Sequence, residues 1–315
     1  MTRTPEGLVP SANERGRVST DFAGAMRDTV MAWDLLIDAV AAIDMAAVGR
    51  KDARTAARTL VVIGSWPEGR PLARIREDAI SGNTLAEPLD GIDDRVIAAH
   101  VRDDREAILD ALHRGRDDVA QWADSPAAAD EALLPVGGPL GVVPLGTLVA
   151  ATAYQCSVAA LDLAPAGVDT PDPLIAAGIA SLIDSVGAVA AQQSADVALQ
   201  ALTPQVRVLM SARGGDWLTR TVTEPVDAPS LACDGRLLLD IAAGRASAPA
   251  AYARGDLRAT DLTGLLAVAQ VLARAPGLPG TDGLRAALQA YTASADAARK
   301  VGDALGGVLR RWRSG

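Results

Sequence analysis

The feature that most constrains this chain is the stretch from Pro135 to Leu163, which reads PVGGPLGVVPLGTLVAATAYQCSVAALDL. Its first part is rich in proline and glycine, so it predicts a loop. From Thr147 onward it has no glycine or proline and a single charged residue, Asp162, which predicts an apolar helix capped by Thr147. A helix this apolar has to be enclosed by other elements, and we therefore expect it at the centre of a helical bundle.

Amphipathic segments precede this central helix. In the first and the last of them apolar residues recur at helical spacing, and in the last one charged residues occupy the opposite face. The predicted helices span residues 22–48, 52–66, 74–83 and 93–122. Together with the central helix they predict a bundle of four main helices over residues 22–163, with a loop at 126–144. Residues 1–21 are polar and lack periodicity, so we expect a flexible arm there.

The sequence changes character after residue 163. Residues 164–204 predict a proline-rich linker followed by a long Ala-rich helix that begins at Pro173 and ends at residue 202. Residues 205–315 are expected to form a small α+β domain, which makes the chain as a whole mainly α. Its predicted elements are β-prone segments at 205–212 and 217–222 joined by a tight turn at 213–216, helices at 231–243, 261–272 and 284–312, and a strand at 257–260.

Composition narrows the classes of partner. The net charge of −9 argues against binding the phosphates of a nucleic acid. The apolar stretch at 173–191 contains Asp184 and several serines and glycines, so we do not expect it to span a membrane. The cysteines, Cys156 and Cys233, form no paired motif and the N-terminal residues have no apolar core, so a reduced, cytoplasmic setting is expected. A homodimer is left open.

Three passages resemble the mycothiol-dependent maleylpyruvate isomerase family. They are RTLVVI at residues 58–63, YQCSVAALDL at 154–163 and LLLDIAAGR at 237–245. The resemblance extends over roughly residues 22–272. It implies an N-terminal four-helix bundle of the DinB-like type and a C-terminal half similar to a sterol-carrier-protein-2 module. It also implies an isomerase or transferase reaction that uses mycothiol as its thiol cofactor.

The resemblance further implies a metal site, and there this chain departs from the family. Metal-binding members carry a histidine on the second helix and a Glu-x-x-x-His pair on the fourth, because ligands at i and i+4 share one helix face. The matching positions here are Ile63, Gln155 and Ala159. Two hydrocarbon side chains and a neutral amide do not make a cation site, so we expect no bound metal. Asp162, one turn beyond Ala159, is expected to cap or tie the helix.

Other candidate catalytic groups lack partners in the sequence. His100 and His113 lie thirteen residues apart on one predicted helix and do not face a common point. No Ser-His-Asp set, Cys-His pair or phosphate-binding loop has the required neighbours. Cys156 lies among apolar residues of the central helix and is expected to be a buried core residue. Catalytic residues are therefore not assigned, and whether the chain is an enzyme is left open.

A cleft beside the central helix is the remaining candidate site. Gln155 and Ala159 are one helical turn apart, and Leu148 and Asp162 continue their row, which we expect to face Ile63 on the second helix. Isoleucine and alanine in place of two imidazoles predict an apolar slot in which Gln155 is the polar group. With these five ligand-binding residues, the expected function is metal-free binding of a small, largely apolar metabolite or lipid. The alternatives are a mycothiol-dependent isomerase or transferase and a non-catalytic interaction protein.

Overall fold

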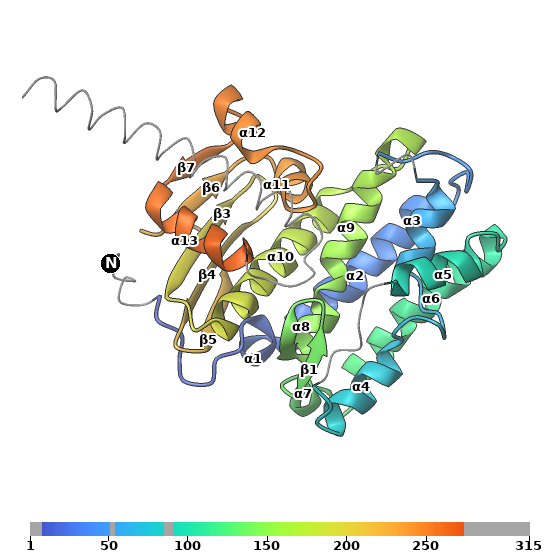
Figure 1. Cartoon of the computed structure of the whole chain (residues 1–315), viewed down its shortest axis with the longest axis horizontal. Helices are drawn as coiled ribbons and strands as arrows, with labels where there is room; N and C mark the ends of the chain where they lie inside the picture. Colours follow the sequence, from blue (N-terminus) through green and yellow to red (C-terminus); the bar gives the residue numbers. More distant parts are fainter. Residues whose placement is uncertain (1–7, 51–53, 85–90, 274–315) are drawn as a thin grey trace, which may run out of the picture.

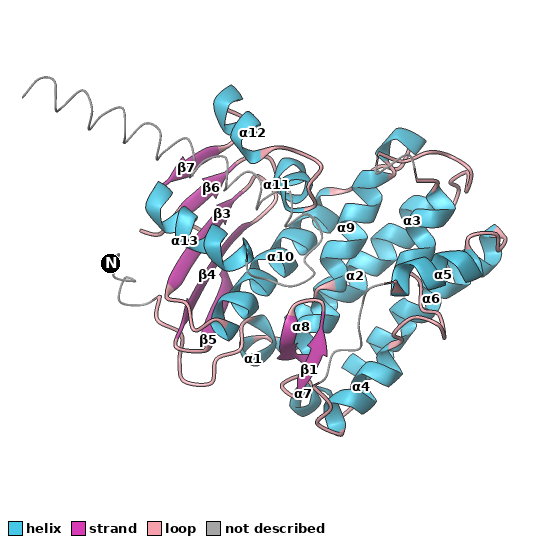
Figure 2. Cartoon of the chain, in the orientation of Figure 1, coloured by secondary structure: helices cyan, strands magenta, loops and turns pink. Residues whose placement is uncertain are grey.

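The computed structural model describes residues 8–50, 54–84 and 91–273. Within these ranges the chain is mainly α-helical and has a smaller α+β part, as the sequence predicts (Figure 2). The helical half and the α+β half lie side by side, and α10 (Asp172–Gln192) lies between them (Figure 1). This helix packs against the bundle on one side and against the sheet on the other.

The helical half comprises α1 to α9 and a short hairpin. Its elements are α1 (Arg17–Thr20), α2 (Phe22–Val40), α3 (Ala56–Ile63), α4 (Leu72–Ile80), α5 (Ile92–His100), α6 (Arg105–Ala123), α7 (Ala128–Glu131), β1 (Pro135–Gly138), β2 (Gly141–Pro144), α8 (Leu145–Ala150) and α9 (Thr152–Asp162). Helix α2 packs against both α6 and α9. A short 3₁₀ turn, η1 (Ala164–Ala166), follows α9.

The predicted central helix is present as α8 and α9, which meet at Ala151. Thr147 lies inside α8 and does not cap it, because the helix begins directly after Pro144, whose φ of −57° suits an entry into helix. The side chains of Cys156 and Ala160 are fully buried, so the expectation that Cys156 is a core residue is confirmed. The central position of α9 is likewise confirmed by its packing between α2 and α10.

Helix α10 accounts for the apolar stretch at 173–191. By length and composition it could cross a membrane, but 94% of its most apolar window is buried inside the fold. Two glycines allow other elements to approach it closely. A Cβ at Gly178 would lie 2.3 Å from the hydroxyl of Ser157, and one at Gly187 would lie 2.5 Å from Trp217. The stretch is therefore apolar because it is the core helix of both halves.

The α+β half is built on a sheet whose order, within the described residues, is β5-β4-β3-β6-β7. Its elements are β3 (Val197–Leu202), β4 (Arg207–Arg213), β5 (Asp216–Thr221), β6 (Ser230–Ala232), α11 (Gly235–Ala242), α12 (Ala248–Arg254), β7 (Arg258–Thr260) and α13 (Leu262–Ala273). The β3–β6 pair is parallel, and the other pairs are antiparallel. Helices α10 and α13 both pack against β3.

The predicted hairpin turn is confirmed. Arg213 pairs with Asp216, and the two residues between them, Gly214 and Gly215, have φ values of 61° and 96°. Positive φ at both central positions is the type I′ geometry, which favours glycine and matches the twist of the flanking strands. The predicted strand at 257–260 is also confirmed as β7.

Three element predictions are wrong, and in the first of them tertiary pairing overrides local helical propensity. The helix expected to reach residue 202 ends at Gln192, and residues 197–202 form β3, whose partner is β4. The helix expected at 93–122 is two helices, because the side chain of Asp104 accepts a hydrogen bond from the amide of Ala107 and so starts α6. The loop expected at 126–144 contains α7 and the β1–β2 hairpin.

The flexible arm expected at 1–21 is corrected for its described part. The amide of Gly16 donates to the carbonyl of Trp217, and the amide of Trp217 donates to the carbonyl of Glu14. Leu8 packs against Leu209 and Leu218 of the sheet. Hydrogen bonds to the backbone of β5 therefore hold this segment, although its own sequence has no strand pattern. The helix predicted at 284–312 lies outside the described residues.

Candidate functional site

A cavity of about 620 Å³ opens into the helical half beside α9. Its walls come from the end of α3, the α3–α4 loop, the start of α5, the middle of α6, and α8 and α9. This volume lies within the range of pockets that hold small organic molecules.

Aliphatic side chains form much of the wall. They are only half-buried: most of them pack against the core on one side, and part of their apolar surface faces the cavity. These residues are Val62, Ile63, Leu72, Ile75, Ile92 and Leu148. The indole rings of Trp33 and Trp66 are buried and complete this apolar lining. Such a wall favours a ligand with a substantial hydrocarbon part.

Among the polar side chains in the lining, Gln155 and Arg54 have no partner within the described residues, and neither does Asp94 at the start of α5. Gln155 is exposed on α9, and its amide has no hydrogen-bond partner among the described residues. Arg54 is half-buried just before α3, and its guanidinium has no ion-pair or hydrogen-bond partner among the described residues either. These groups can therefore bind a ligand without first breaking a contact inside the protein.

Other polar groups of the lining serve the architecture. Arg70 donates to the carbonyl of Gly137, 2.9 Å away, and pairs with Asp78 at 3.1 Å. The hydroxyl of Ser65 donates to Asp118 at 3.3 Å. The first two contacts fix the α3–α4 loop against the β1–β2 hairpin and α4, and the third fixes it against α6.

The α3–α4 loop also carries Trp66, which contacts titratable side chains behind the cavity wall. Its indole donates to the carbonyl of Val61 at 2.8 Å, and the guanidinium of Arg114 lies 5.6 Å from the ring centroid. His100 stacks on the same ring. Burial lowers the pKa of His100, but hydrogen bonds to Glu68 and Asp103 outweigh it and raise this pKa above its ordinary value. His113 is exposed on α6, away from this stack.

The structure brings together three of the five residues expected at the site. Ile63, Leu148 and Gln155 all line the cavity. Ala159 does not line it, because this residue is only 3% exposed and packs in the core shared with α2 and α3. Asp162 also lies outside the lining, since its carboxylate is bound elsewhere. The row of side chains predicted on the central helix is therefore exposed at Gln155 and covered beyond it.

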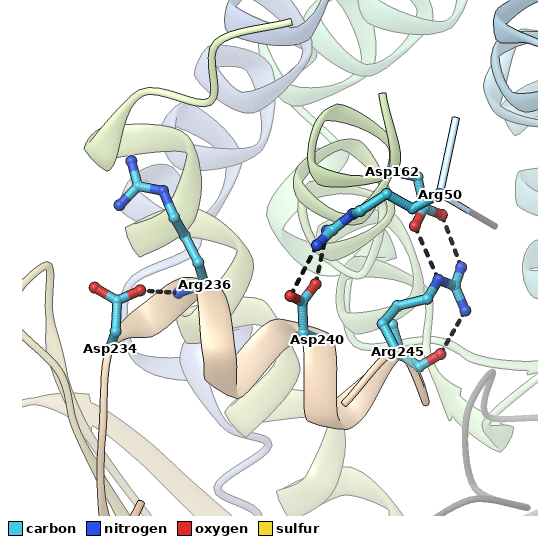
Figure 3. A network of polar contacts seen from close by, with 7 residues as sticks. Arg50, Asp162, Asp234, Arg236, Asp240 and Arg245 are labelled. Atoms are coloured by element: carbon cyan, nitrogen blue, oxygen red, sulfur yellow. Dashed lines mark hydrogen bonds and ion pairs between the residues drawn. The ribbon is translucent and has the colours of Figure 1, made fainter. Parts of the chain in front are cut away.

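Asp162 forms part of a polar network between the two halves (Figure 3). Its carboxylate accepts two hydrogen bonds from Arg245, from Nε at 2.8 Å and from Nη2 at 2.7 Å. Its backbone carbonyl accepts from the amide of Arg50 at 2.7 Å. The expectation that Asp162 ties the helix agrees with these contacts, but the partner that it binds comes from the distant α+β half.

The metal implied by the family resemblance does not fit these residues. Ile63 presents hydrocarbon to the cavity, Gln155 presents a neutral amide, and Ala159 is buried. Within the described ranges, no group of three or more histidine, cysteine, aspartate or glutamate side chains could hold a metal ion. Cation sites of the zinc type need three or four such donors. The donor set beside α9 therefore does not suit a divalent cation.

Most of the lining residues were not predicted from the sequence, and Trp33, Trp66 and Arg54 show why. Trp33 belongs to the apolar stripe expected for the first helix, so its type of environment was predictable, but its place in the cavity wall was not. Trp66 ended the second predicted helix and gave no further signal. Arg54 lies at the cavity because residues 45–49 form backbone hydrogen bonds with residues 54–57, which no local pattern indicates.

Comparison with known proteins gives a distant structural likeness. No protein-family model matches the sequence, and no curated protein matches it either. The chain is similar to the crystal structure of mycothiol-dependent maleylpyruvate isomerase, at 14% sequence identity and a TM-score of 0.46, over 77% of this chain and 93% of that chain. A sec-alkyl sulfatase is similar over 64% of this chain and 29% of that chain, at 14% identity and a TM-score of 0.28. Likenesses this distant assign no role to any residue of this chain.

Proposed function

We propose that this protein binds a small, largely apolar organic molecule in the cavity beside α9, without a metal ion. The observation that carries the proposal is the exposed amide of Gln155, which lines a cavity of about 620 Å³ and has no partner among the described residues. A polar group in an apolar wall is costly to desolvate unless a ligand or water satisfies it. We therefore assign Gln155 as the group that orients the ligand.

The aliphatic lining supplies affinity in this account. Burying apolar surface contributes about 25 cal/mol for each Å² removed from water. The half-buried side chains of Ile63, Leu72 and Leu148 would each gain from contact with a ligand. Arg54 adds a positive charge at the same cavity, which favours ligands that also carry a hydrogen-bond acceptor. Ile63, Leu148 and Gln155 remain proposed ligand-binding residues, whereas Ala159 and Asp162 are withdrawn from that role.

Binding fits the lining better than catalysis does. The described lining contains no histidine or cysteine, and Ser65 and Arg70 are already engaged in structural hydrogen bonds. Its carboxylates are Asp93 and Asp94 at the start of α5 and Asp118, which accepts from Ser65. We propose that the helical half is a DinB-like bundle in which Ile63 and Gln155 stand where metal ligands would be. A mycothiol-dependent reaction would be the better account if the retained compound were a thiol or its adduct.

The experiment exposes purified protein to a small-molecule cell extract, removes unbound compounds by rapid gel filtration, and identifies by mass spectrometry what is released on denaturation. The comparison variant is Gln155→Trp, which places a large side chain in the cavity. Ala98→Trp is the matched control, because Ala98 is exposed on α5 and does not line the cavity.

The proposal expects one compound or compound class to be retained by the wild type and by Ala98→Trp, and to be lost from Gln155→Trp. Equal retention by all three proteins would place the ligand elsewhere. Retention of nothing, by any of them, would favour the alternative in which the apolar cavity is an interaction surface.

A further inference from the structure

We infer that Asp240 and Arg245, both from the α+β half, are positioning residues for Arg54 and Gln155, two polar groups of the cavity lining. The inference rests on the proposed function, because it explains how Arg54 and Gln155 are held for a ligand. Neither residue lines the cavity, so each would act through the segment that it binds.

The end of α11 is built to present Arg245 toward α9. Gly244 has a φ of 71°, in the left-handed region that favours glycine. The amide of Gly244 donates to the carbonyl of Ile241, and the amide of Arg245 donates to the carbonyl of Asp240 at 2.7 Å. This pair of bonds is a Schellman motif, which ends the helix and turns the chain. The glycine therefore fixes where the next side chain, Arg245, leaves the helix.

The first contact fastens the end of α9. Arg245 binds the carboxylate of Asp162 with two nitrogens, and the side chain of Asp162 is only 5% exposed. Two parallel charge-assisted hydrogen bonds restrict both distance and orientation. Asp162 lies seven residues after Gln155, which is close to two turns of the same helix. Fixing Asp162 therefore limits the rotation and shift of the helix that carries Gln155.

The second contact fastens the segment that leads to Arg54. Asp240 accepts from Arg50 at 2.8 and 3.0 Å, again through both carboxylate oxygens. The amide of Gly49 donates to the carbonyl of Arg54 at 2.8 Å, and Val48 pairs with Thr55. These bonds link Arg54 to Gly49, and the next residue, Arg50, is held by α11.

The two contacts meet at one point of the backbone. The amide of Arg50 donates to the carbonyl of Asp162 at 2.7 Å, so the two fastened segments also bind each other. Gly49 permits this approach, because a Cβ at that position would lie 2.7 Å from the same carbonyl oxygen. Figure 3 shows Arg50 and Asp162 side by side, with Asp240 and Arg245 reaching them from the helix below. The α+β half therefore acts on Gln155 and on Arg54 through one shared junction.

The test compares Asp240→Asn and Arg245→Gln with Asp172→Asn. Asp172 is the matched control, because its ion pair with Arg236 also joins α11 to a neighbouring helix but is exposed and lies within the α10–α11 contact. The first readout is hydrogen exchange of the Gly49 and Arg50 amides, measured by NMR. The second is the dissociation constant of the fluorescent probe 1-anilinonaphthalene-8-sulfonate, with Gln155→Trp defining the part of its binding that occurs in the cavity.

The inference expects exchange of both amides to become about 5- to 10-fold faster in Asp240→Asn and Arg245→Gln, since their protecting contacts open locally. Cavity binding of the probe should weaken by about 3- to 10-fold, which is within the usual range of coupling between sites. Asp172→Asn should change neither quantity. A charge exchange, Arg50→Asp combined with Asp240→Arg, should recover both, whereas each single change should not.

Different failures are distinguishable. Unchanged exchange and unchanged probe affinity in Asp240→Asn and Arg245→Gln would overturn the inference while leaving the cavity proposal intact. If Gln155→Trp does not change the dissociation constant of the probe, the cavity proposal fails for this probe. The amide exchange rates alone then decide whether α11 holds Arg50 and the end of α9. The inference would also be overturned if the double variant Arg50→Asp, Asp240→Arg folds but recovers neither the amide exchange rates nor the probe affinity.

Discussion

The imidazole of His100 lies parallel to the indole of Trp66, with ring centroids 3.8 Å apart and an angle of 15° between the planes. Its Nε2 is 2.9 Å from the carboxylate of Glu68, and its Nδ1 is 2.8 Å from that of Asp103. Trp66 belongs to the loop that lines the cavity, and His100 is the last residue of α5, whose first turn also lines it. The stack therefore fastens two walls of the cavity to each other.

This stack predicts a pH dependence of stability. Both ring nitrogens face carboxylates, so the imidazolium is the favoured form and the pKa of His100 is raised in the folded protein. Its contribution to the free energy of unfolding is fully present below the unfolded pKa of about 6.5 and is lost as pH rises through the folded pKa. The denaturation midpoint of the wild type should thus exceed that of His100→Gln at about pH 6, and the difference should shrink toward about pH 8.5.

The matched control for this titration is His113→Gln, because His113 is exposed. Urea denaturation across the same pH range gives the wild-type-minus-variant difference for both substitutions, and the fall in this difference with rising pH should be larger for His100→Gln. A constant difference for His100→Gln would show that the stack does not titrate in this range.

A second prediction concerns Gln155 and Ala159 of α9, which the sequence placed in one site and the structure places in a cavity wall and in the core. Gln155→Trp should change the free energy of unfolding by less than about 1 kcal/mol, because its side chain is exposed in the cavity. Ala159→Trp should destabilise by about 3 kcal/mol or more, because Ala159 is 3% exposed and has no room for an indole. Chemical denaturation of both variants checks this, and equal stability of the two would contradict the packing described for α9.

A third prediction concerns the N-terminal segment on the sheet. Gly16 has a φ of 61°, and a Cβ there would lie 2.1 Å from Oδ1 of Asp184 and 2.2 Å from Nε1 of Trp217. Gly82 has a similar φ of 70° but open space around it. Gly82→Ala should therefore cost about 1 kcal/mol, which is the cost of the left-handed backbone alone. Gly16→Ala should cost at least about 1 kcal/mol more, and thermal unfolding that ranks the two equally would argue against this contact.

A fourth prediction addresses Asp184, which is buried on α10. Its carboxylate accepts from the indole of Trp217 at 3.1 Å and from the amide of Arg17 at 3.2 Å, while burial raises its pKa. The pKa of an aspartate in the unfolded chain is about 3.9. Because the pKa of Asp184 is higher than this in the folded protein, the free energy of unfolding falls as pH rises above about 3.9. Asp184→Asn, which keeps an acceptor and removes the charge, should gain stability relative to the wild type between about pH 4 and pH 7.

Asp184→Leu serves as the counterpart to that substitution. It should destabilise by about 2–4 kcal/mol at every pH, because the indole of Trp217 and the amide of Arg17 would be buried without an acceptor. Denaturation curves at several pH values compare the two variants. If Asp184→Asn instead loses stability relative to the wild type as pH rises, the buried carboxylate must be stabilised in its charged form.

Features that depend on neighbouring residues were predictable from the sequence. The β4–β5 turn follows from two consecutive glycines that both take positive φ. The buried helix that contains Cys156 follows from a run without breakers or charge. Within the candidate site, the approach of Gln155 and Ile63 to one cavity was expected from the family resemblance, and the structure places both in its lining.

Features that depend on distant residues were not predictable in the same way. Asp162 and Ala159 share a helix face with Gln155, but Arg245 and the packing of α2 and α3 cover them. The strand β3 has an alanine-rich sequence that suits a helix, and pairing with β4 decides its conformation. Arg54 is held at the cavity by the hydrogen bond from the amide of Gly49 to its carbonyl. Each outcome depends on a partner far away in the chain, which periodicity does not report.

The most direct test of a ligand in the cavity is native mass spectrometry of protein isolated from cells without added ligand. The account predicts a discrete mass increment of small-molecule size on the wild type, present on Ala98→Trp and absent from Gln155→Trp. After brief exposure to cell extract, the increment should reappear on stripped wild type but not on stripped Gln155→Trp. A wild type that keeps its bare polypeptide mass in both conditions, or a Gln155→Trp protein that carries the same increment, would contradict the account.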